Sequence, residues 1–399
     1  MKSNQDYNYI PEELVQEILL YLSAEDLQNY KLVSKCWFSL ISQPNFVNNH
    51  LNFTPSQTLD TIIFTTITKP TILNNTFVYR HYSLTNIKSK DATMIKELQL
   101  PLSKPNAFAL LASCDGLLLF QDRYRPSQLY VCNPLTADFA HLPHLSCSKY
   151  GGWALIPDAS GTNVYKVLGI NCSVLLETLI FGDKTVLTPD DWKLCSFAKK
   201  DNDSTPFRLL SEPLVVGKTV YWLTTGLYQV HNQNQDCFCI YSLDFDKGTF
   251  VRNKLSPQMA KPRDYNDFSK CRGPHLLSVL KGGSLCLTLV SRCVLKMFVL
   301  NRSIWKLSHT VFLQTMFNRP AFLESFWSDN ICLVSMRCID ISNLPDLVKV
   351  LIHHEDQLAL FDLKTQELRE IGILSKDQKL DRSCFHHSNS LLSCAWTSN

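Results

Sequence analysis

The sequence predicts a mainly β protein with a small all-α module at its N-terminus, and three patterns support this fold class. The first fifty residues carry apolar residues at helical spacing, behind residues that favour helix starts. After residue 55, the apolar segments become short, rich in β-branched and aromatic residues, and bounded by Gly, Pro, Asn and Asp. Polar turns then begin near positions 133, 182, 246, 301 and 362, a spacing of roughly fifty to sixty residues.

The length and composition fit a short module followed by a large folded domain. The chain has 399 residues, of which 45% are hydrophobic and 19% are charged, so a sizeable core is expected. The formal net charge is only +3 and is dispersed, so nucleic acid is not expected as the main ligand. Residues 1–50 contain three lysines and six acidic residues, whereas the rest of the chain is basic. This asymmetry supports a domain boundary near residue 50.

No segment predicts export or insertion into a membrane. The first residues lack the apolar core of a signal peptide, and the most apolar later stretch, Leu285 to Leu300, is short and contains Arg292 and Lys296. The fifteen cysteines show no framework spacing, which is typical of buried thiols in a reducing compartment. We therefore expect an intracellular protein, in the cytoplasm, the nucleus or both, with no membrane partner.

The apolar pattern of the first fifty residues predicts three short helices. Pro11 suits a first helical position, because its missing N–H is not needed there. Ser23 and Ser34 are expected to cap the second and third helices, with apolar residues on both sides of each cap. Pro44 is expected to end the third helix. A closing turn would follow, formed by Phe46, Val47 and Leu51.

These helices carry more apolar side chains than a bundle of about forty residues can bury against itself. The excess is expected to pack on another surface, either the chain's own β domain or a separate protein. Periodicity alone leaves both alternatives open. The residues concerned are Ile10, Leu14, Val15, Ile18, Leu19, Leu22, Leu27, Tyr30, Leu32, Val33, Trp37, Phe38, Leu40 and Ile41.

Three segments of the module resemble the F-box in order and spacing. They are Ile10-Pro11-Glu12-Glu13-Leu14-Val15-Gln16-Glu17-Ile18-Leu19, Leu22-Ser23-Ala24-Glu25-Asp26-Leu27 and Leu32-Val33-Ser34-Lys35-Cys36-Trp37-Phe38-Ser39-Leu40-Ile41. The sequence departs from the family pattern at Ile10, where Leu is usual, and at Asn29-Tyr30-Lys31, where a basic–aromatic–basic run is common.

The F-box resemblance implies that the module docks on a Skp-family adaptor, which in turn binds a cullin scaffold. Carried over by position, the adaptor-facing residues would be Pro11, Leu14, Ile18, Leu22, Leu27, Val33, Trp37 and Leu40. Trp37 would be the hot spot of this interface, because truncating a buried indole costs about 2 kcal/mol or more.

The rest of the chain is expected to form a propeller-like β domain, with irregular β-sandwiches as the alternative. The turn spacing matches four-stranded blades with variable loops. We assign residues 1–52 to the helical module, 53–100 to a connecting segment and first strands, and 101–399 to the β domain. Expected strands include Leu117–Phe120, Leu129–Cys132, Val164–Ile170, Val220–Leu223, Phe238–Leu243 and Leu358–Leu363.

Several motifs of this region resemble the plant F-box-associated interaction domain. They include Ser113-Cys114-Asp115-Gly116-Leu117-Leu118, Asn133-Pro134-Leu135-Thr136 and Val216-Gly217-Lys218-Thr219-Val220-Tyr221-Trp222. The resemblance implies a domain that binds proteins destined for ubiquitination. Because loops carry specificity on rigid scaffolds, we assign target binding to two basic and aromatic segments, with plain solvent-facing loops as the alternative. Their candidate residues are Arg123, Tyr124, Arg125, Arg263 and Tyr265.

No motif predicts catalysis, a cofactor or a metal site. No two cysteines have the spacing of a CxxC zinc knuckle, and Cys237 and Cys239 fit a strand better than a metal site. His141 and His144 flank a proline, so they cannot form a helical ligand pair. The glycine patterns of hydrolases, dinucleotide sites and P-loops are missing.

The sequence therefore predicts a non-catalytic substrate-recognition subunit of a cullin-based (SCF-type) ubiquitin ligase. Its helices would bind the Skp-family adaptor, and its β domain would bind a target protein for ubiquitination and proteasomal degradation. The first alternative is a ligase-independent binding protein that only associates with the adaptor. The second is an enzyme with an active site at the mouth of a propeller.

Overall fold

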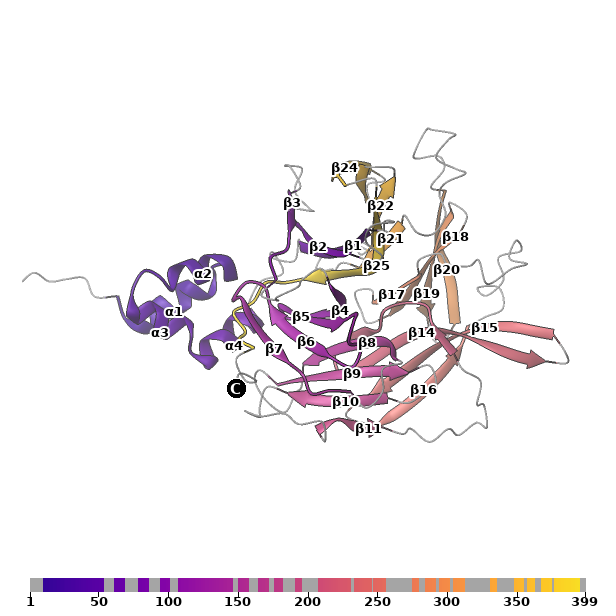
Figure 1. Cartoon of the computed structure of the whole chain (residues 1–399), viewed down its shortest axis with the longest axis horizontal. Helices are drawn as coiled ribbons and strands as arrows, with labels where there is room; N and C mark the ends of the chain where they lie inside the picture. Colours follow the sequence, from indigo (N-terminus) through magenta and orange to yellow (C-terminus); the bar gives the residue numbers. More distant parts are fainter. Residues whose placement is uncertain are drawn as a thin grey trace, which may run out of the picture.

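In the computed structural model of the chain, the described residues form four helices followed by six antiparallel β-sheets (Figure 1). The described residues are 10–53, 61–68, 78–85, 94–100, 107–145, 150–157, 164–171, 176–181, 191–195, 207–230, 233–245, 247–255, 275–279, 284–291, 294–301, 304–312, 331–335, 348–354, 357–362, 367–374 and 377–394.

The helical module has the caps that the sequence predicts and one helix more than expected. Its helices are α1 (Glu12–Leu20), α2 (Ala24–Tyr30), α3 (Lys35–Ile41) and α4 (Pro44–Phe53). The hydroxyls of Ser23 and Ser34 each accept a backbone N–H at 3.1 Å, so both serines are N-caps. Pro44 does follow the end of α3, but the expected closing turn is wrong. Proline is well tolerated in a first helical turn, and here it begins α4. None of the described helices is long and apolar enough to cross a bilayer.

The six sheets have four strands each, except one that has a fifth. The first two sheets, in strand order, are β25 (Gln378–His387), β1 (Thr61–Thr68), β2 (Val78–Thr85) and β3 (Met94–Glu97), and then β4 (Phe108–Cys114), β5 (Leu117–Asp122), β6 (Leu129–Asn133) and β7 (Asp138–His141). The third sheet is β8 (Tyr150–Pro157), β9 (Tyr165–Asn171), β10 (Leu176–Phe181) and β11 (Lys193–Cys195), and the fourth is β12 (Phe207–Leu209), β14 (Thr219–Val230), β15 (Gln233–Asp244) and β16 (Thr249–Lys254), with β13 (Leu214–Val216) also paired to β14. The fifth sheet is β17 (His275–Val279), β18 (Leu285–Ser291), β19 (Val294–Asn301) and β20 (Ile304–Phe312), and the sixth is β21 (Ile331–Ser335), β22 (Val348–His354), β23 (Gln357–Asp362) and β24 (Glu367–Ile373).

Neighbouring sheets contact each other mainly through the first strand of each, and these contacts close a ring. Strand β25 contacts β4, β4 contacts β8, β8 contacts β12 and β13, β13 contacts β17, β17 contacts β21, and β21 contacts β25 again. The domain is therefore a β-propeller whose sheets are its blades (Figure 1), and the sandwich alternative is wrong. Five blades use consecutive strands. The remaining blade joins β1–β3 to the C-terminal strand β25. The ring is therefore closed by the pairing of β1 with β25, which come from the two ends of the domain.

The recurrent turns of the sequence all fall between the third and fourth strands of a blade. Residues 133–137 join β6 to β7, and the turn at Gly248 joins β15 to β16. The turns near 182, 301 and 362 fall at the same step of three further blades, although residues 182–185, 302–303 and 363–365 lie outside the described residues. The strands expected at 129–132, 164–170 and 358–363 agree with β6, β9 and β23 to within one residue at each end. The other three are longer than expected, since β5 extends to Asp122, β14 to Val230 and β15 back to Gln233.

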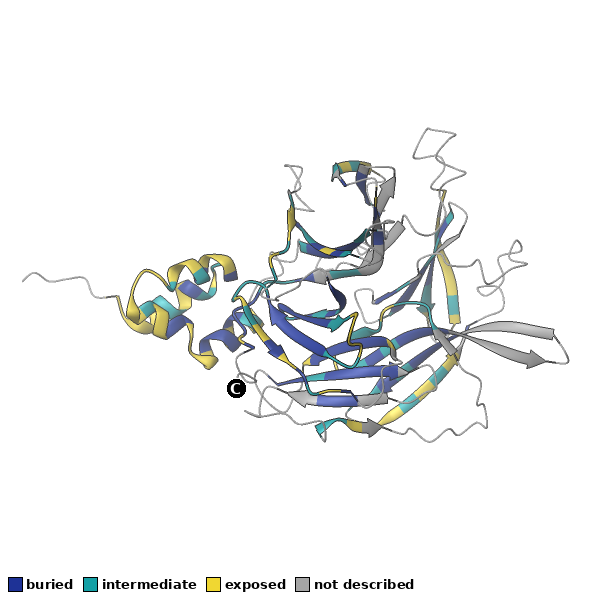
Figure 2. Cartoon of the chain, viewed as in Figure 1, coloured by how far each residue is buried: buried dark blue, intermediate teal, exposed yellow. Residues whose placement is uncertain are grey.

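Among the described residues, one hydrophobic core runs from the helical module into the propeller. It joins Leu19, Leu27, Leu40 and Ile41 of the helices to buried residues of β4–β10. The module nevertheless projects from the ring, and most of its surface is exposed (Figure 2).

Candidate functional site

The exposed face of the helical module carries apolar side chains that nothing in the described structure covers. On α1, Leu14 is 49% exposed and Ile18 is 58% exposed. These residues are four apart, so they are neighbours on one side of the helix, and the exposed Tyr21 follows three residues later. Val33, between α2 and α3, is 63% exposed. Exposed apolar side chains at neighbouring helical positions are typical of surfaces that bind another macromolecule.

The structure separates the eight predicted adaptor-facing residues into three groups. Four are exposed: Pro11, Leu14, Ile18 and Val33. Two are half-buried: Leu22 and Trp37. The placement of the other two is corrected, because Leu27 and Leu40 are at most 2% exposed and belong to the core between the helices. Their apolar character therefore holds the module together and does not contribute contact surface.

Trp37 keeps part of its indole at the surface of the module. It is half-buried, and its ring meets Tyr30 edge-on at a centroid distance of 5.6 Å. If the module only packed against its own propeller, the β-sheets would cover Trp37. They do not cover it completely. Other exposed apolar residues of the module lie outside the predicted adaptor-facing set. Ile10, Tyr30, Leu32 and Phe38 belong to the predicted surplus, whereas Tyr21 and Phe53 were not predicted.

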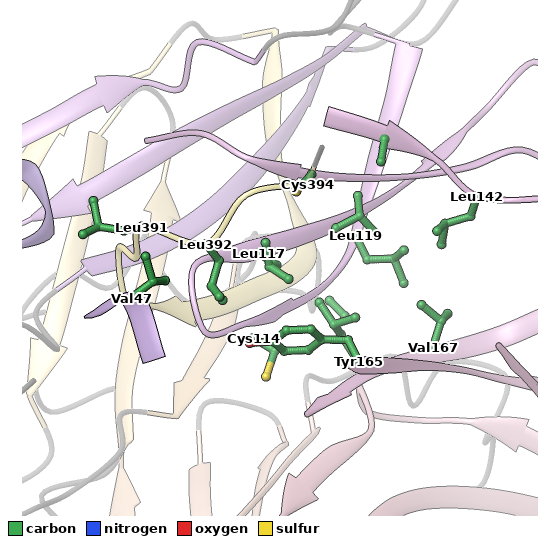
Figure 3. Packing of buried hydrophobic residues seen from close by; sticks show 14 of the residues in the cluster. Val47, Cys114, Leu117, Leu119, Leu142, Tyr165, Val167, Leu391, Leu392 and Cys394 are labelled. Carbon is green, nitrogen blue, oxygen red and sulfur yellow. The ribbon is translucent and has the colours of Figure 1, made fainter. Parts of the chain in front are cut away.

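A C-terminal segment, residues 388–394, holds the module on the propeller. Leu391 and Leu392 are buried in the same cluster as Val47 of α4 (Figure 3). Within the module, His50 of α4 is hydrogen-bonded through Nε2 to the carbonyl of Leu22 at 2.9 Å, which ties α4 to the α1–α2 connection. Helix α4 and the C-terminal segment thus form one packed joint.

Asn133, at the end of β6, fixes the backbone of this segment. Its side chain is fully buried, and Nδ2 donates hydrogen bonds to the carbonyls of Ser390 (2.9 Å) and Leu392 (2.8 Å). Its Oδ1 accepts the backbone N–H of Leu135 at 3.0 Å. The hydroxyl of Ser390 also donates to the carbonyl of Asp115 at 2.6 Å. Blade β4–β7 therefore binds the segment at two turns, one at Asp115 and one at Asn133.

A chain of hydrogen bonds runs from the centre of the propeller to the module. Ser113 of β4 contacts Nδ1 of His387 at 3.1 Å, and His387 Nε2 contacts Asn389 Oδ1 at 3.1 Å. Because an amide oxygen only accepts, Nε2 carries the proton and Nδ1 accepts from the serine hydroxyl. Asn389 Nδ2 then donates to Glu25 of α2. These bonds add directional contacts to the apolar joint.

The predicted target-binding loop connects β5 to β6, at the opposite end of β5 from the turn that Ser390 contacts. Arg123, Tyr124 and Arg125 are all exposed. Asp122 orders the loop, since its Oδ1 accepts the backbone N–H groups of Tyr124 (2.7 Å) and Arg125 (3.2 Å). The guanidinium of Arg123 lies 4.8 Å from the ring centroid of Tyr79 in β2. The other two predicted residues, Arg263 and Tyr265, lie outside the described residues.

A cavity of about 180 Å³ lies among the inner strands of the propeller, with Asp115 and Glu212 among the residues that line it. The described residues include no group of three metal-ligating side chains. Two buried thiols, Cys132 and Cys394, have pKa values raised by burial, that of Cys394 to about 12. Both are therefore protonated at neutral pH and are poor nucleophiles.

Comparison with known proteins identifies the helical module. Residues 9–49 match the F-box domain family. The module is an F-box domain. The chain is also similar to F-box proteins of Arabidopsis thaliana, among them F-box protein At3g08750, with 25% identity over 62% of this chain and 65% of that protein. F-box protein CPR1 is 27% identical over 40% of this chain and 34% of that protein. The matches cover between a third and two thirds of these relatives' own lengths.

Beyond the F-box domain, the comparisons are less specific. Among solved structures, the β-propeller domain of the Trilobed protease from Pyrococcus furiosus aligns over 78% of this chain and 80% of that chain, with 10% identity and a TM-score of 0.36. The Aleuria aurantia lectin aligns over 79% and 96%, with 8% identity and a TM-score of 0.37. Likenesses of this size carry no functional argument. The assignment of the propeller to the F-box-associated domain family stays a prediction.

Proposed function

We propose that this protein is the substrate-recognition subunit of an SCF-type ubiquitin ligase. The F-box domain docks on a Skp-family adaptor, which connects it to a cullin scaffold, and the propeller binds a target protein. The chain supplies no catalytic residue. It promotes ubiquitination by holding the target's lysines close to the charged conjugating enzyme, which raises their effective concentration. Degradation of the target by the proteasome follows.

The observation that supports this proposal is the uncovered apolar face of the F-box domain. Leu14, Ile18 and Val33 each expose about half or more of their side chains, although the propeller and the C-terminal segment are already packed on the module. Covering the rest of each side chain contributes about 1 kcal/mol, since full burial of such a residue contributes roughly 1.5–3 kcal/mol. Together with the indole of Trp37, this is enough to make the face a protein-binding hot spot.

The test is co-purification of the full chain with a Skp-family adaptor. We expect the double variant Leu14→Glu and Val33→Glu to lose adaptor binding, because it places two charges in a desolvated interface. Both side chains are exposed, so the fold is retained. The matched control is Ile304→Glu on β20, which is also 63% exposed but lies in the propeller. Wild-type binding by the double variant would contradict the proposal.

A second measurement separates this function from ligase-independent binding. We expect cullin to co-purify with the complex, and a protein bound to the propeller to accumulate when the proteasome is inhibited. Adaptor binding without cullin, or without any accumulating protein, would favour the ligase-independent alternative. Location in the cytoplasm or the nucleus stays a prediction, which fluorescence microscopy of the tagged chain tests.

A further inference from the structure

We propose that the loop between β5 and β6 is an anion-recognition surface, and that the segment of the target bound there is an acidic peptide. This inference rests on the proposed function, because it names the chemistry of the protein that the propeller receives. It is carried by two arginines with an exposed tyrosine between them. They are Arg123, Tyr124 and Arg125, which we call the arginine loop.

The two guanidinium groups of the arginine loop form no ion pair within the described structure. No described carboxylate forms an ion pair with Arg123 or Arg125, whereas Arg80, on the adjoining blade, has Glu97 at 4.0 Å. The nearest acidic residue in sequence, Asp122, is engaged by two backbone N–H groups of the loop. Two guanidinium groups are thus available to an external partner.

The loop is also held in one conformation before any partner arrives. Its backbone is joined to the rest of the blade by a bond from the Arg123 N–H to the Ala107 carbonyl at 3.0 Å. At its other end the Gln128 N–H donates to the Arg125 carbonyl at 2.8 Å, and Gln121 donates to the Pro126 carbonyl at 2.7 Å. A loop ordered in advance loses little conformational entropy on binding, so its contacts contribute more to affinity.

The Arg123 side chain is oriented as well. Its guanidinium lies 4.8 Å from the centroid of the Tyr79 ring, and Tyr79 itself is buried. A guanidinium that contacts an aromatic ring through its face keeps its in-plane N–H donors, which match a carboxylate or phosphate in a two-bond arrangement. Tyr124 is 63% exposed and adds a rigid aromatic contact next to these donors.

The position of the loop suits a target-binding role. Strand β5 begins at the turn of Asp115, which Ser390 of the C-terminal segment contacts, and it ends at the arginine loop. Six strand residues span about 20 Å. A peptide on the loop therefore lies at the end of the blade away from the joint that carries the F-box domain, where the two partners do not compete for space.

The test is fluorescence anisotropy with the full chain bound to its Skp-family adaptor. The probes are labelled heptapeptides of glutamate, of serine and of lysine, with a phosphoserine heptapeptide to show which anion binds more tightly. We expect the glutamate peptide to bind more tightly than the serine and lysine peptides, with an affinity that falls as salt rises. The double variant Arg123→Ala and Arg125→Ala should weaken glutamate binding at least tenfold.

The matched control is the double variant Lys247→Ala and Lys306→Ala, which removes two exposed charges from other blades. We expect its affinity for the glutamate peptide to stay within twofold of wild type. The proposal is overturned if wild type prefers neither acidic peptide over serine, or if both double variants weaken binding equally. Adaptor co-purification of the arginine variant tests the proposed function separately, and it should remain normal.

Discussion

Replacing Asn133 by alanine tests whether the C-terminal segment holds the F-box domain on the propeller. The Asn133 amide makes three hydrogen bonds in a fully buried position, two of them to carbonyls of residues 390 and 392. Alanine removes all three bonds. The Leu135 N–H and the Ser390 carbonyl lose their Asn133 partner, whereas the Leu392 carbonyl keeps the Thr136 hydroxyl at 3.5 Å. The apolar contacts of Leu391 and Leu392 would remain, as would the hydrogen bonds of Asn389 and Ser390, so the variant isolates the contribution of Asn133.

The expected cost follows from the number of bonds. Each buried hydrogen bond contributes about 1 kcal/mol net, and a group left unpaired costs about 1–3 kcal/mol. For three bonds, the loss is about 3–4 kcal/mol in the free energy that keeps the segment in place. Because 1.36 kcal/mol corresponds to a factor of ten, amide hydrogen exchange in residues 388–394 should become at least about 100-fold faster.

Two further variants decide whether hydrogen bonding is the cause. Asn133→Asp keeps the size and an acceptor for the Leu135 N–H but loses the two donated bonds, so we expect it to cost at least as much as alanine. The control is Asn48→Ala in α4, since the Asn48 Nδ2 is buried without a hydrogen-bond partner among the described residues. We expect it to cost less than about 1 kcal/mol. Unchanged exchange in the Asn133→Ala protein would refute the reasoning.

Two other features give predictions on stability. His81 is buried with its pKa lowered to about 4, mainly by desolvation, and it joins two blades through the Phe108 carbonyl at 3.1 Å. Its neutral form is favoured in the folded state, so stability is complete above pH 6.5 and falls by up to about 3 kcal/mol as the pH drops to 4. Urea unfolding should show this loss in wild type and a smaller one in His81→Gln. In the same assay, Gly116→Ala should cost more than Gly217→Ala. Both glycines have positive φ, but an added Cβ at Gly116 meets Ser390, whereas the space at Gly217 is open. Equal costs would show that backbone strain alone acts at Gly116.

The helices were predictable because their signals are local. Ser23 and Ser34 cap helices at the expected positions, since a cap involves only three or four neighbouring residues. Pro44 illustrates the limit of such signals, because proline is compatible both with the end of one helix and with the first turn of the next. The burial of Leu27 and Leu40 could not be predicted either, as an apolar stripe does not say which of its members face the partner helix.

The ring was predictable from a repeat but its closure was not. The five recurrent turns could be recognised in the sequence because each lies at the same step of its blade, between the third and fourth strands. First strands were predicted within residues 53–100, but their pairing with the C-terminal strand β25 was not, since β25 comes from the other end of the chain. The joint at Asn133 was missed for the same reason: its bonds connect residues more than 250 positions apart, and no local pattern records them.

The proposed ligase function gives the Asn133→Ala variant a second expected effect. Leu14 and Val33, for which we propose adaptor contact, are remote in sequence from the C-terminal segment, and the α2 and α3 caps are internal to the module. Adaptor binding should therefore survive the loss of Asn133, while the angle between F-box domain and propeller becomes less defined. Small-angle scattering of the adaptor complex should then show a broader distribution of distances than wild type.

A target held at a varying distance from the conjugating enzyme meets it less often in the productive geometry, so ubiquitination should slow with no change in adaptor affinity. Equal rates in the two proteins would mean that the joint stabilises the fold without setting the reach of the ligase.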